Sequence, residues 1–252
     1  MTEQEHTMYQ ILGKISEINA PIVFKGALIT KLILQENGYT ATERQTNDID
    51  ANWVGTPPSM DKLTMIVNRS LESFGGSIYA LAKRQYGEGK SAGIWIMSRD
   101  TEEQVFTMDI TIKPVIGSRV YHYGETSING VIPEAVLCDK ISVLSGERIF
   151  RRVKDVLDVY ALSCCLKVRL VDIYDALQKA NRLLGSFEPL ITRGADLEHA
   201  YNKMRGVTGK PEFNEIYSYI KKFLEPFVHN DKGKKVWDSN KAIWEEAIEK
   251  IT

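Results

Sequence analysis

The sequence predicts an α+β protein, with a mixed sheet and flanking helices in the first half and a helical second half. Two observations lead to this prediction. Strand-like and helical runs alternate over residues 1–132. From Pro133 onward, apolar residues recur at helical spacing almost to the end of the chain. We therefore expect two domains, an α/β domain over residues 1–132 and a helical domain over residues 133–252.

The expected elements of the first half follow from the apolar periodicity. Pro57-Pro58-Ser59 ends a strand, and Asn129-Gly130 predicts a hairpin turn. Residues 87–91 predict a hairpin tip rather than a P-loop, because the earlier glycine that a P-loop needs is replaced by Arg84. In chain order we expect a helix over 7–18, a buried strand over 21–24, a helix over 27–34, a strand over 48–54, a helix over 60–74, and strands over 77–85, 93–98 and 105–112.

The composition excludes several classes of protein. The chain has 252 residues, of which 43% are hydrophobic and 26% are charged, as is typical of a globular protein. A formal net charge of −1 excludes a basic coat for indiscriminate nucleic-acid binding, and it excludes an acidic disordered tail. The sum conceals a split, because residues 1–139 carry roughly −5 and residues 140–252 roughly +4.

The cysteines and the apolar runs bear on the compartment. Cys138, Cys164 and Cys165 have neither the pattern of a disulfide framework nor the spacing of a metal site. The N-terminal segment is polar and acidic, unlike a secretory signal, and no apolar run approaches the length that spans a bilayer. We therefore expect a cytoplasmic protein that does not bind membranes.

Three aspartates are candidates for a metal site. Asp48 and Asp50 are two residues apart on a predicted strand, so both side chains project from one face. Asp109 lies on the polar face of the alternating strand 105–112. If these strands are neighbours, the three carboxylates converge, and a hard cation such as Mg²⁺ would relieve their repulsion. The alternative is that the aspartates face solvent separately on half-exposed strands.

A glycine turn precedes the carboxylates in the sequence. Lys25-Gly26 ends the first strand and a helix begins directly after it, so backbone N–H groups would face a phosphate there. Two Mg²⁺ ions held by the carboxylates would activate an attacking hydroxyl and neutralise charge on the transferring phosphate. A glycine turn beside an Asp-x-Asp strand is therefore typical of nucleotidyl transfer.

This run resembles the abortive-infection toxin nucleotidyltransferases, the AbiEii/AbiGii toxin family of the polymerase-β-like superfamily. The resemblance implies a nucleotidyltransferase fold, with Asp109 as the third aspartate of the family. It also implies that the residues around the glycine turn and before the Asp-x-Asp pair contact the nucleotide. The matching positions are Lys25, Gly26, Ala27, Arg44, Thr46, Asp48 and Asp50.

The resemblance continues in the helical half, with a lysine-bearing helix, an arginine and a Lys-Asp-x-x-Asp helix. It implies that Lys140, Arg148 and Lys154 hold the triphosphate of the nucleotide. It further implies that Asp155 or Asp158 orients these basic groups. Taken alone, the residues also allow a solvated helix face on which Arg151–Asp155 and Lys154–Asp158 form i,i+4 pairs.

One position departs from the family pattern. The second glycine of the family motif, or the serine that the wider superfamily has there, is Ala27 in this chain. Alanine offers its backbone N–H to a phosphate but no hydroxyl. Thr30, one helical turn later, is a candidate substitute.

The sequence thus predicts an enzyme that moves a nucleoside monophosphate from an NTP to an acceptor hydroxyl and releases pyrophosphate. Asp48 and Asp50 would ligate two Mg²⁺ ions, and Asp109 would ligate one and help to deprotonate the acceptor. The resemblance implies a toxin of a toxin–antitoxin or phage-defence system, with an antitoxin as partner and a tRNA 3′ end as acceptor. Two alternatives stay open. One is a degenerate transferase that binds nucleotide or a partner without turnover, and the other is a transferase acting on a small molecule or a protein hydroxyl.

Overall fold

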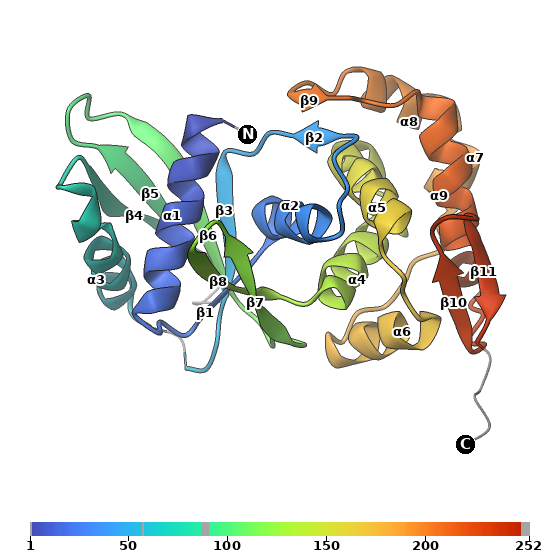
Figure 1. Ribbon diagram of the computed structural model, residues 1–252, viewed down its shortest axis with the longest axis horizontal. Coiled ribbons are helices and arrows are strands. Elements are labelled where there is room, and N and C mark those ends of the chain that lie inside the picture. The colour runs from blue at the N-terminus through green and yellow to red at the C-terminus, as the bar shows by residue number, and fades with distance from the viewer. Residues whose placement is uncertain (1, 57, 87–90, 248–252) are drawn as a thin grey trace. The chain divides into compact units, whose positions relative to one another are not determined.

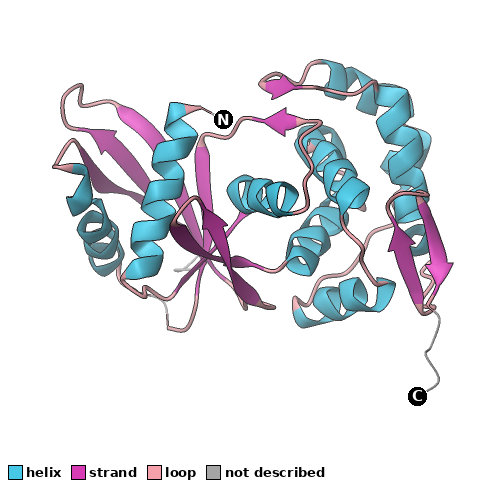
Figure 2. Ribbon diagram, viewed as in Figure 1, coloured by secondary structure: helices cyan, strands magenta, loops and turns pink. Residues whose placement is uncertain are grey.

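The computed structural model describes residues 2–56, 58–86 and 91–247. Within these residues the chain has an α+β fold with a mixed seven-stranded sheet and flanking helices (Figures 1 and 2), which confirms the predicted fold class. The chain divides into two compact units. Unit 1 comprises residues 1–32 and 45–132, and unit 2 comprises residues 33–44 and 133–252. No described helix is long and apolar enough to cross a membrane.

Unit 1 contains the helices and strands that the periodicity predicts, with ends shifted by a few residues. The first helix is closed by a capping box, in which the hydroxyl of Thr2 accepts from the N–H of Glu5 and the Glu5 carboxylate accepts from the N–H of Thr2. In order, its elements are α1 (Glu3–Glu17), β1 (Ile22–Lys25), the start of α2 (Gly26–Glu36), β3 (Asp48–Trp53), α3 (Met60–Leu71), β4 (Ile78–Tyr86), β5 (Ser91–Ser98), β6 (Gln104–Ile112), β7 (Ser118–Tyr123) and β8 (Thr126–Val131).

The sheet has the strand order β4-β5-β6-β3-β1-β8-β7. The pairs β3–β6 and β1–β8 are parallel, and the remaining pairs are antiparallel. Along β3 and β6, apolar side chains such as Ile49 and Met108 are fully buried and alternate with polar ones. Helix α3 is tied to β4 because the side-chain amide of Asn68 bonds both the N–H and the carbonyl of Ala80.

The predicted hairpin turn at Asn129-Gly130 is wrong. Both residues lie inside β8, and the β7–β8 hairpin turns instead at Gly124, which has a φ of 56°. A Cβ at Gly130 would lie 2.7 Å from Cδ1 of Ile29 and 2.9 Å from the ring of Tyr121, so close packing rather than turn formation favours this glycine. Most of the predicted hairpin tip, residues 87–90, lies outside the described residues, as does Pro57 of the predicted strand breaker.

Unit 2 is mostly helical, but the prediction of helix almost to the end of the chain is wrong. The last described segment forms an antiparallel strand pair in which Trp237 is completely buried. The described elements of unit 2 are the end of α2, β2 (Glu43–Arg44), α4 (Pro133–Leu144), α5 (Val153–Cys165), α6 (Leu170–Lys179), α7 (Glu188–Thr192), α8 (Gly194–Asn202), β9 (Val207–Thr208), α9 (Phe213–Val228), β10 (Lys235–Asp238) and β11 (Ile243–Glu246), with β2 paired to β9.

Candidate active site

The three predicted aspartates project from one face of the sheet of unit 1. Strands β3 and β6 run parallel in a register that pairs Asp50 with Asp109, and Asp48 with Thr107. Residues that are paired directly across two strands point to the same side. We call this side the carboxylate face, defined by Asp48, Asp50 and Asp109. The condition that the two strands be neighbours is therefore met, whereas the chemical role of the aspartates stays a prediction.

The surroundings of the three carboxylates differ. Asp48 is exposed at the start of β3, and its Oδ1 accepts a hydrogen bond of 2.7 Å from the hydroxyl of Thr107. Asp50 and Asp109 are half-buried. The Lys25 ammonium donates to Oδ1 of Asn52 and to the hydroxyl of Thr111, at 2.6 Å each. Lys25 of β1, which the resemblance places near the nucleotide, thus belongs to a polar network with side chains of β3 and β6.

The start of helix α2 lies directly beside Asp50. Gly26 has a φ of 72°, and a Cβ there would lie 2.8 Å from the Cβ of Asp50 and still nearer to its carboxylate. Only glycine permits this backbone conformation and this approach without strain. The first N–H groups of α2 have no partner inside the helix by geometry, and its first turn holds no acidic residue. A second anion at this helix start would therefore lie next to the Asp50 carboxylate.

The other predicted contacts around the glycine turn are placed as follows. Ala27 is the second residue of α2. Thr30 is 2% exposed, and its hydroxyl donates to the carbonyl of Gly26 at 2.8 Å. To reach a phosphate, Thr30 would have to give up that bond. Thr46 is buried, with its backbone N–H donating to the Glu5 carboxylate at 3.0 Å.

The oxygen ligands on the carboxylate face are of the kind that a hard divalent cation prefers, but the three side chains are not close enough together to bind one. Carboxylate oxygens from neighbouring strands are the ligands that Mg²⁺ prefers. Among the described residues, however, no three His, Cys, Asp or Glu side chains stand close enough together to hold a metal ion. Asp48 is turned to Thr107 instead. The register pairs two candidate ligands, Asp50 and Asp109, and Asp48 would have to leave Thr107 to join them.

Lys83 is a residue of this site that the sequence analysis missed. The register between β4 and β5 shifts at Ala82/Arg84, so Lys83 occupies a bulge. A Cβ on Gly93, which pairs with Asp109, would lie 3.1 Å from Cδ of Lys83 and 3.4 Å from Oδ1 of Asp109. The Lys83 stem thus covers Gly93 beside Asp109. The bulge changes the direction in which this side chain points. The sequence analysis missed it because strand alternation alone does not indicate a bulge.

A second polar cluster lies inside unit 2. The Lys140 ammonium donates to Asp155 at 3.0 Å and to Asp158 at 2.6 Å, and all three side chains are buried. Arg44 of β2 bonds Asp158 through Nε at 3.2 Å and Nη2 at 3.0 Å. Arg152 bonds Asp155 at 2.7 Å. The cluster ties β2 to helices α4 and α5 by charge-assisted hydrogen bonds.

Burial and ion pairing oppose each other in this cluster. Burial alone would lower the pKa of Lys140, but Asp158 and Asp155 outweigh it and hold that pKa above its ordinary value. Burial alone would raise the pKa of Asp158, but Lys140 and Arg44 outweigh it and hold that pKa below its ordinary value. Lys140 and Asp158 are therefore both charged at neutral pH.

The solvated helix face that the residues alone allowed is wrong for both aspartates. Asp155 and Asp158 are 4% and 6% exposed, and their partners are Lys140, Arg152 and Arg44 rather than Arg151 and Lys154. Lys154 of α5 is exposed, as is Arg148, which precedes that helix. That Arg44, Lys140, Arg148 or Lys154 contacts a triphosphate stays a prediction.

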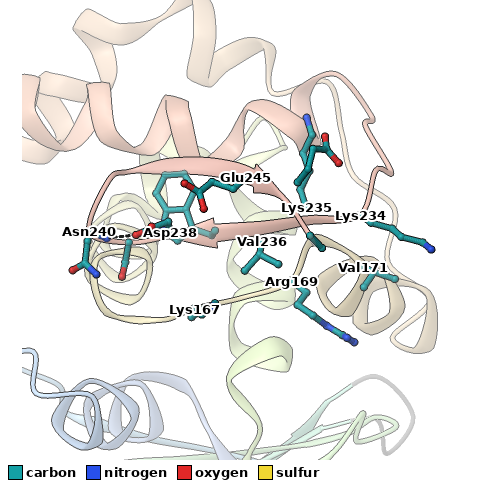
Figure 3. Close-up of a pocket in the computed structure, with 13 residues that line it drawn as sticks. Lys167, Arg169, Val171, Lys234, Lys235, Val236, Asp238, Asn240 and Glu245 are labelled. Atoms are coloured by element: carbon teal, nitrogen blue, oxygen red, sulfur yellow. Dashed lines mark hydrogen bonds between the residues drawn. The ribbon is translucent and has the colours of Figure 1, made fainter. Parts of the chain in front are cut away.

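Unit 2 also holds an open pocket of about 820 Å³ beside strands β10 and β11 (Figure 3). Part of the basic run 232–235 reaches it, since Lys234 and Lys235 line the wall. Lys235 is paired with Asp231 at 2.6 Å, and Arg169, also in the lining, is paired with Asp172. Carboxylates stand on the same walls, so the pocket has mixed charge and does not mark an anion site. The acidic lining residues are Asp238, Glu245 and Glu246.

Comparisons with known proteins found distant likenesses among solved structures. No family model and no curated protein matches the sequence. Among solved structures, the nucleotidyltransferase toxin MenT4 from Mycobacterium tuberculosis is 13% identical, with 75% of this chain and 70% of that chain covered and a TM-score of 0.48. An antigenic nucleotidyltransferase-like protein from Paracoccidioides brasiliensis is 16% identical, with 79% and 91% covered and a TM-score of 0.45. Likenesses at this level carry no conclusion about activity.

Proposed function

We propose that the protein is a nucleotidyltransferase that moves a nucleoside monophosphate from an NTP to an acceptor hydroxyl. One observation carries the proposal: Asp50 is the cross-strand partner of Asp109 and also touches the start of helix α2 at Gly26. Two carboxylates and a helix N-terminus that favours phosphate therefore meet at one point. The motif resemblance at Lys25-Gly26 and at Asp48–Asp50 supports the same activity.

The arrangement argues for a cation between protein and substrate. A triphosphate at the start of α2 would lie against the Asp50 carboxylate, and two anions in contact repel unless a cation lies between them. Asp50 and Asp109 would hold Mg²⁺, with two ions once Asp48 leaves Thr107. Bound there, Mg²⁺ would supply charge neutralisation on the phosphates and a more acidic acceptor hydroxyl.

The proposed reaction is a displacement at the α-phosphorus of the NTP. The acceptor oxygen forms a bond to that phosphorus, the bond to the bridging oxygen breaks, and pyrophosphate leaves. Asp109 takes the proton of the acceptor hydroxyl, because it lies on the strand farther from the helix start. The N–H groups at the start of α2 would stabilise charge on the leaving pyrophosphate.

We further propose that the acceptor is an RNA end such as a tRNA 3′ end, and that the protein is the toxin of a toxin–antitoxin or phage-defence pair. The motif resemblance supports these finer proposals, and the roughly +4 charge of residues 140–252 is compatible with an RNA acceptor. A small DNA-binding antitoxin encoded next to the gene would support the biological role.

The test is a transfer assay with the purified protein, each α-³²P-labelled NTP, Mg²⁺ and one acceptor class at a time. The acceptor classes are total tRNA, a mixture of hydroxyl-bearing metabolites, and protein. We expect label on one class, with loss of labelling in the Asp50→Asn and Asp109→Asn variants. Asp61→Asn, at an exposed position of helix α3, is the matched control and should label as the wild type does. Labelling of no acceptor, or equal labelling by Asp50→Asn, would sink the proposal.

A second candidate function is nucleotide binding without turnover. It is favoured by the absence of a formed three-carboxylate group among the described residues and by Ala27, which lacks a hydroxyl for phosphate. Isothermal titration calorimetry with NTP and Mg²⁺ would separate the two candidates. Heat of binding together with no pyrophosphate release over many hours would favour the binder.

A further inference from the structure

The carboxylate face continues beyond Asp109 onto strands β5 and β4. Thr107 of β6 pairs with Trp95 of β5, and Trp95 pairs in turn with Leu81 of β4. Directly paired residues share a face, so Trp95 and Leu81 stand on the same side of the sheet as Asp48 and Asp109. Trp95 is 36% exposed and Leu81 is 41% exposed. An indole ring and an isobutyl group are thus open to solvent beside the candidate active site.

The adjoining row on the same face adds one lysine next to Asp109. Gly93 pairs with Asp109, and the stem of Lys83 covers Gly93 from the bulge in β4. The surface next to the carboxylates therefore combines a flat aromatic ring, an apolar neighbour and a lysine. This combination is what single-stranded nucleic acids recognise, because bases stack on aromatic rings and backbone phosphates attract cations.

Trp95 lies close enough to Asp109 for one nucleotide to contact both. Trp95 is the diagonal cross-strand neighbour of Asp109, with about 7–8 Å between their Cα atoms. Both side chains project from the same face of the sheet. A terminal hydroxyl at Asp109 would therefore leave its own base over Trp95.

The strand order decides which substrate the platform serves. Gly26 at the start of α2 touches Asp50 from the β1 side, whereas Trp95 lies on β5, on the far side of β6. The triphosphate, at the start of α2, and Trp95 are therefore on opposite sides of the Asp50–Asp109 pair. Trp95 is on the side from which the acceptor would come.

We propose that Trp95 and Leu81 form a stacking platform for the terminal base of a single-stranded nucleic-acid acceptor, with Lys83 contacting its backbone. The proposal rests on the proposed function and names its acceptor class from this sheet face. Trp95 is a positioning residue, because it holds the acceptor base and touches no reacting atom. An acceptor without a base, such as a protein hydroxyl, would gain nothing from this surface.

The test measures binding rather than transfer, so it does not depend on turnover. The probe is a short 5′-fluorescein single-stranded RNA, compared with the same strand ending in an abasic nucleotide, in EDTA and without NTP. Fluorescence anisotropy gives the dissociation constant for the wild type, Trp95→Ala, Trp95→Phe and Leu81→Ala. Val120→Ala, which truncates a 55% exposed side chain on β7 at the other edge of the sheet, is the matched control.

Stacking of one base predicts a loss of about fivefold to 150-fold in affinity for Trp95→Ala. Trp95→Phe keeps an aromatic ring and should keep most of the affinity, which also shows that the position tolerates substitution. The wild type should bind the abasic strand more weakly by a similar factor, and Trp95→Ala should bind both strands equally. Lys83→Met should make the slope of log affinity against log salt concentration shallower by about 0.7, the value for one phosphate contact on a single strand.

Two results would overturn the proposal. One is equal RNA binding by the wild type and Trp95→Ala, which would assign the face to another class of partner such as a protein. The other is a wild type that does not distinguish the abasic strand. The proposed function fails separately, because Asp50→Asn should lose transfer and keep discrimination against the abasic strand. If the wild type binds the abasic strand more weakly but transfers no label, the proposed enzymatic function is refuted and the stacking platform is still supported.

Discussion

The buried ion cluster of unit 2 gives the sharpest stability prediction, through the substitution Asp158→Asn. Asn has nearly the same shape as Asp but cannot neutralise the two cations that meet there. Asp158 accepts from Arg44 at 3.2 and 3.0 Å and from Lys140 at 2.6 Å. Summing three hydrogen bonds to a charged group would give about 4.5–9 kcal/mol.

That sum is too large, because both partners keep other ways to be satisfied. Lys140 retains Asp155 at 3.0 Å, and the side chain of Arg44 is 12% exposed and so reaches water. The loss expected on breaking a buried pair is about 3–5 kcal/mol, which corresponds to a fall in Tm of about 6–20 °C for a chain of this size. Thermal unfolding should be followed by tryptophan fluorescence, to which Trp237 of unit 2 contributes with the other three tryptophans, and by circular dichroism, because two units need not unfold together.

The matched control is Asp172→Asn. Asp172 also pairs with an arginine, Arg169, but the side chains in that pair are 63% and 32% exposed. An exposed pair contributes little, so its removal should leave Tm unchanged. The reasoning is refuted if Asp158→Asn unfolds within about a degree of the wild type, or if both variants lose the same stability.

The same cluster predicts how stability depends on pH. The folded-state pKa of Asp158 is lowered, so its contribution is present above the unfolded pKa of about 3.9 and is lost as pH falls through the folded pKa. The folded-state pKa of Lys140 is raised, so its contribution is present below the unfolded pKa of about 10.4 and is lost as pH rises through the folded pKa. Urea unfolding at stepped pH should therefore show an acid decline that is shallower in Asp158→Asn.

Two further predictions concern the carboxylate face, the first with Gly38→Ala in unit 2 as its control. Gly38→Ala, at a φ of 70° with open space around it, should cost about 1 kcal/mol in urea unfolding. Gly26→Ala should cost more and raise the KM for NTP, because its Cβ also meets Asp50. Thr107→Val should lower the Mg²⁺ concentration needed for half-maximal activity, because it releases Asp48 from its hydroxyl partner; an unchanged Mg²⁺ titration would show that Asp48 need not turn.

The parts of the fold that could be predicted are those in which local periodicity and packing agree. The strict alternation along residues 105–112 placed Asp109 on the polar side of its strand, and the spacing of Asp48 and Asp50 placed both on one face. Whether the two strands are neighbours depends on topology, which spacing cannot provide. The register that pairs Asp50 with Asp109 therefore came only from the structure.

The predictions that were wrong, and the site residue that was not predicted, depend on tertiary contacts. Asn129-Gly130 has turn chemistry, but Gly130 is needed where Ile29 packs against the strand. Asp155 and Asp158 follow a helical pattern that also suits a solvated face. Their buried partners are distant in the sequence, because Lys140 is 15 residues from Asp155 and 18 from Asp158, and Arg44 is 114 residues from Asp158. Trp95 carried no motif at all. Its exposure on a sheet face, next to Thr107 and Asp109, is a property of strand pairing.

The strand order also constrains the proposed reaction. In phosphoryl transfer the attacking and leaving oxygens lie roughly in line, so acceptor and pyrophosphate must be on opposite sides of the reacting phosphorus. Gly26 and the start of α2 lie on one side of the Asp50–Asp109 pair, and Trp95 lies on the other. Substitutions at the two ends should therefore separate kinetically. Gly26→Ala should raise the KM for NTP with little change in that for RNA, and Trp95→Ala should do the reverse. A change of both constants by either variant would mean that the two substrates share one side of the carboxylates, and the in-line arrangement would then be wrong.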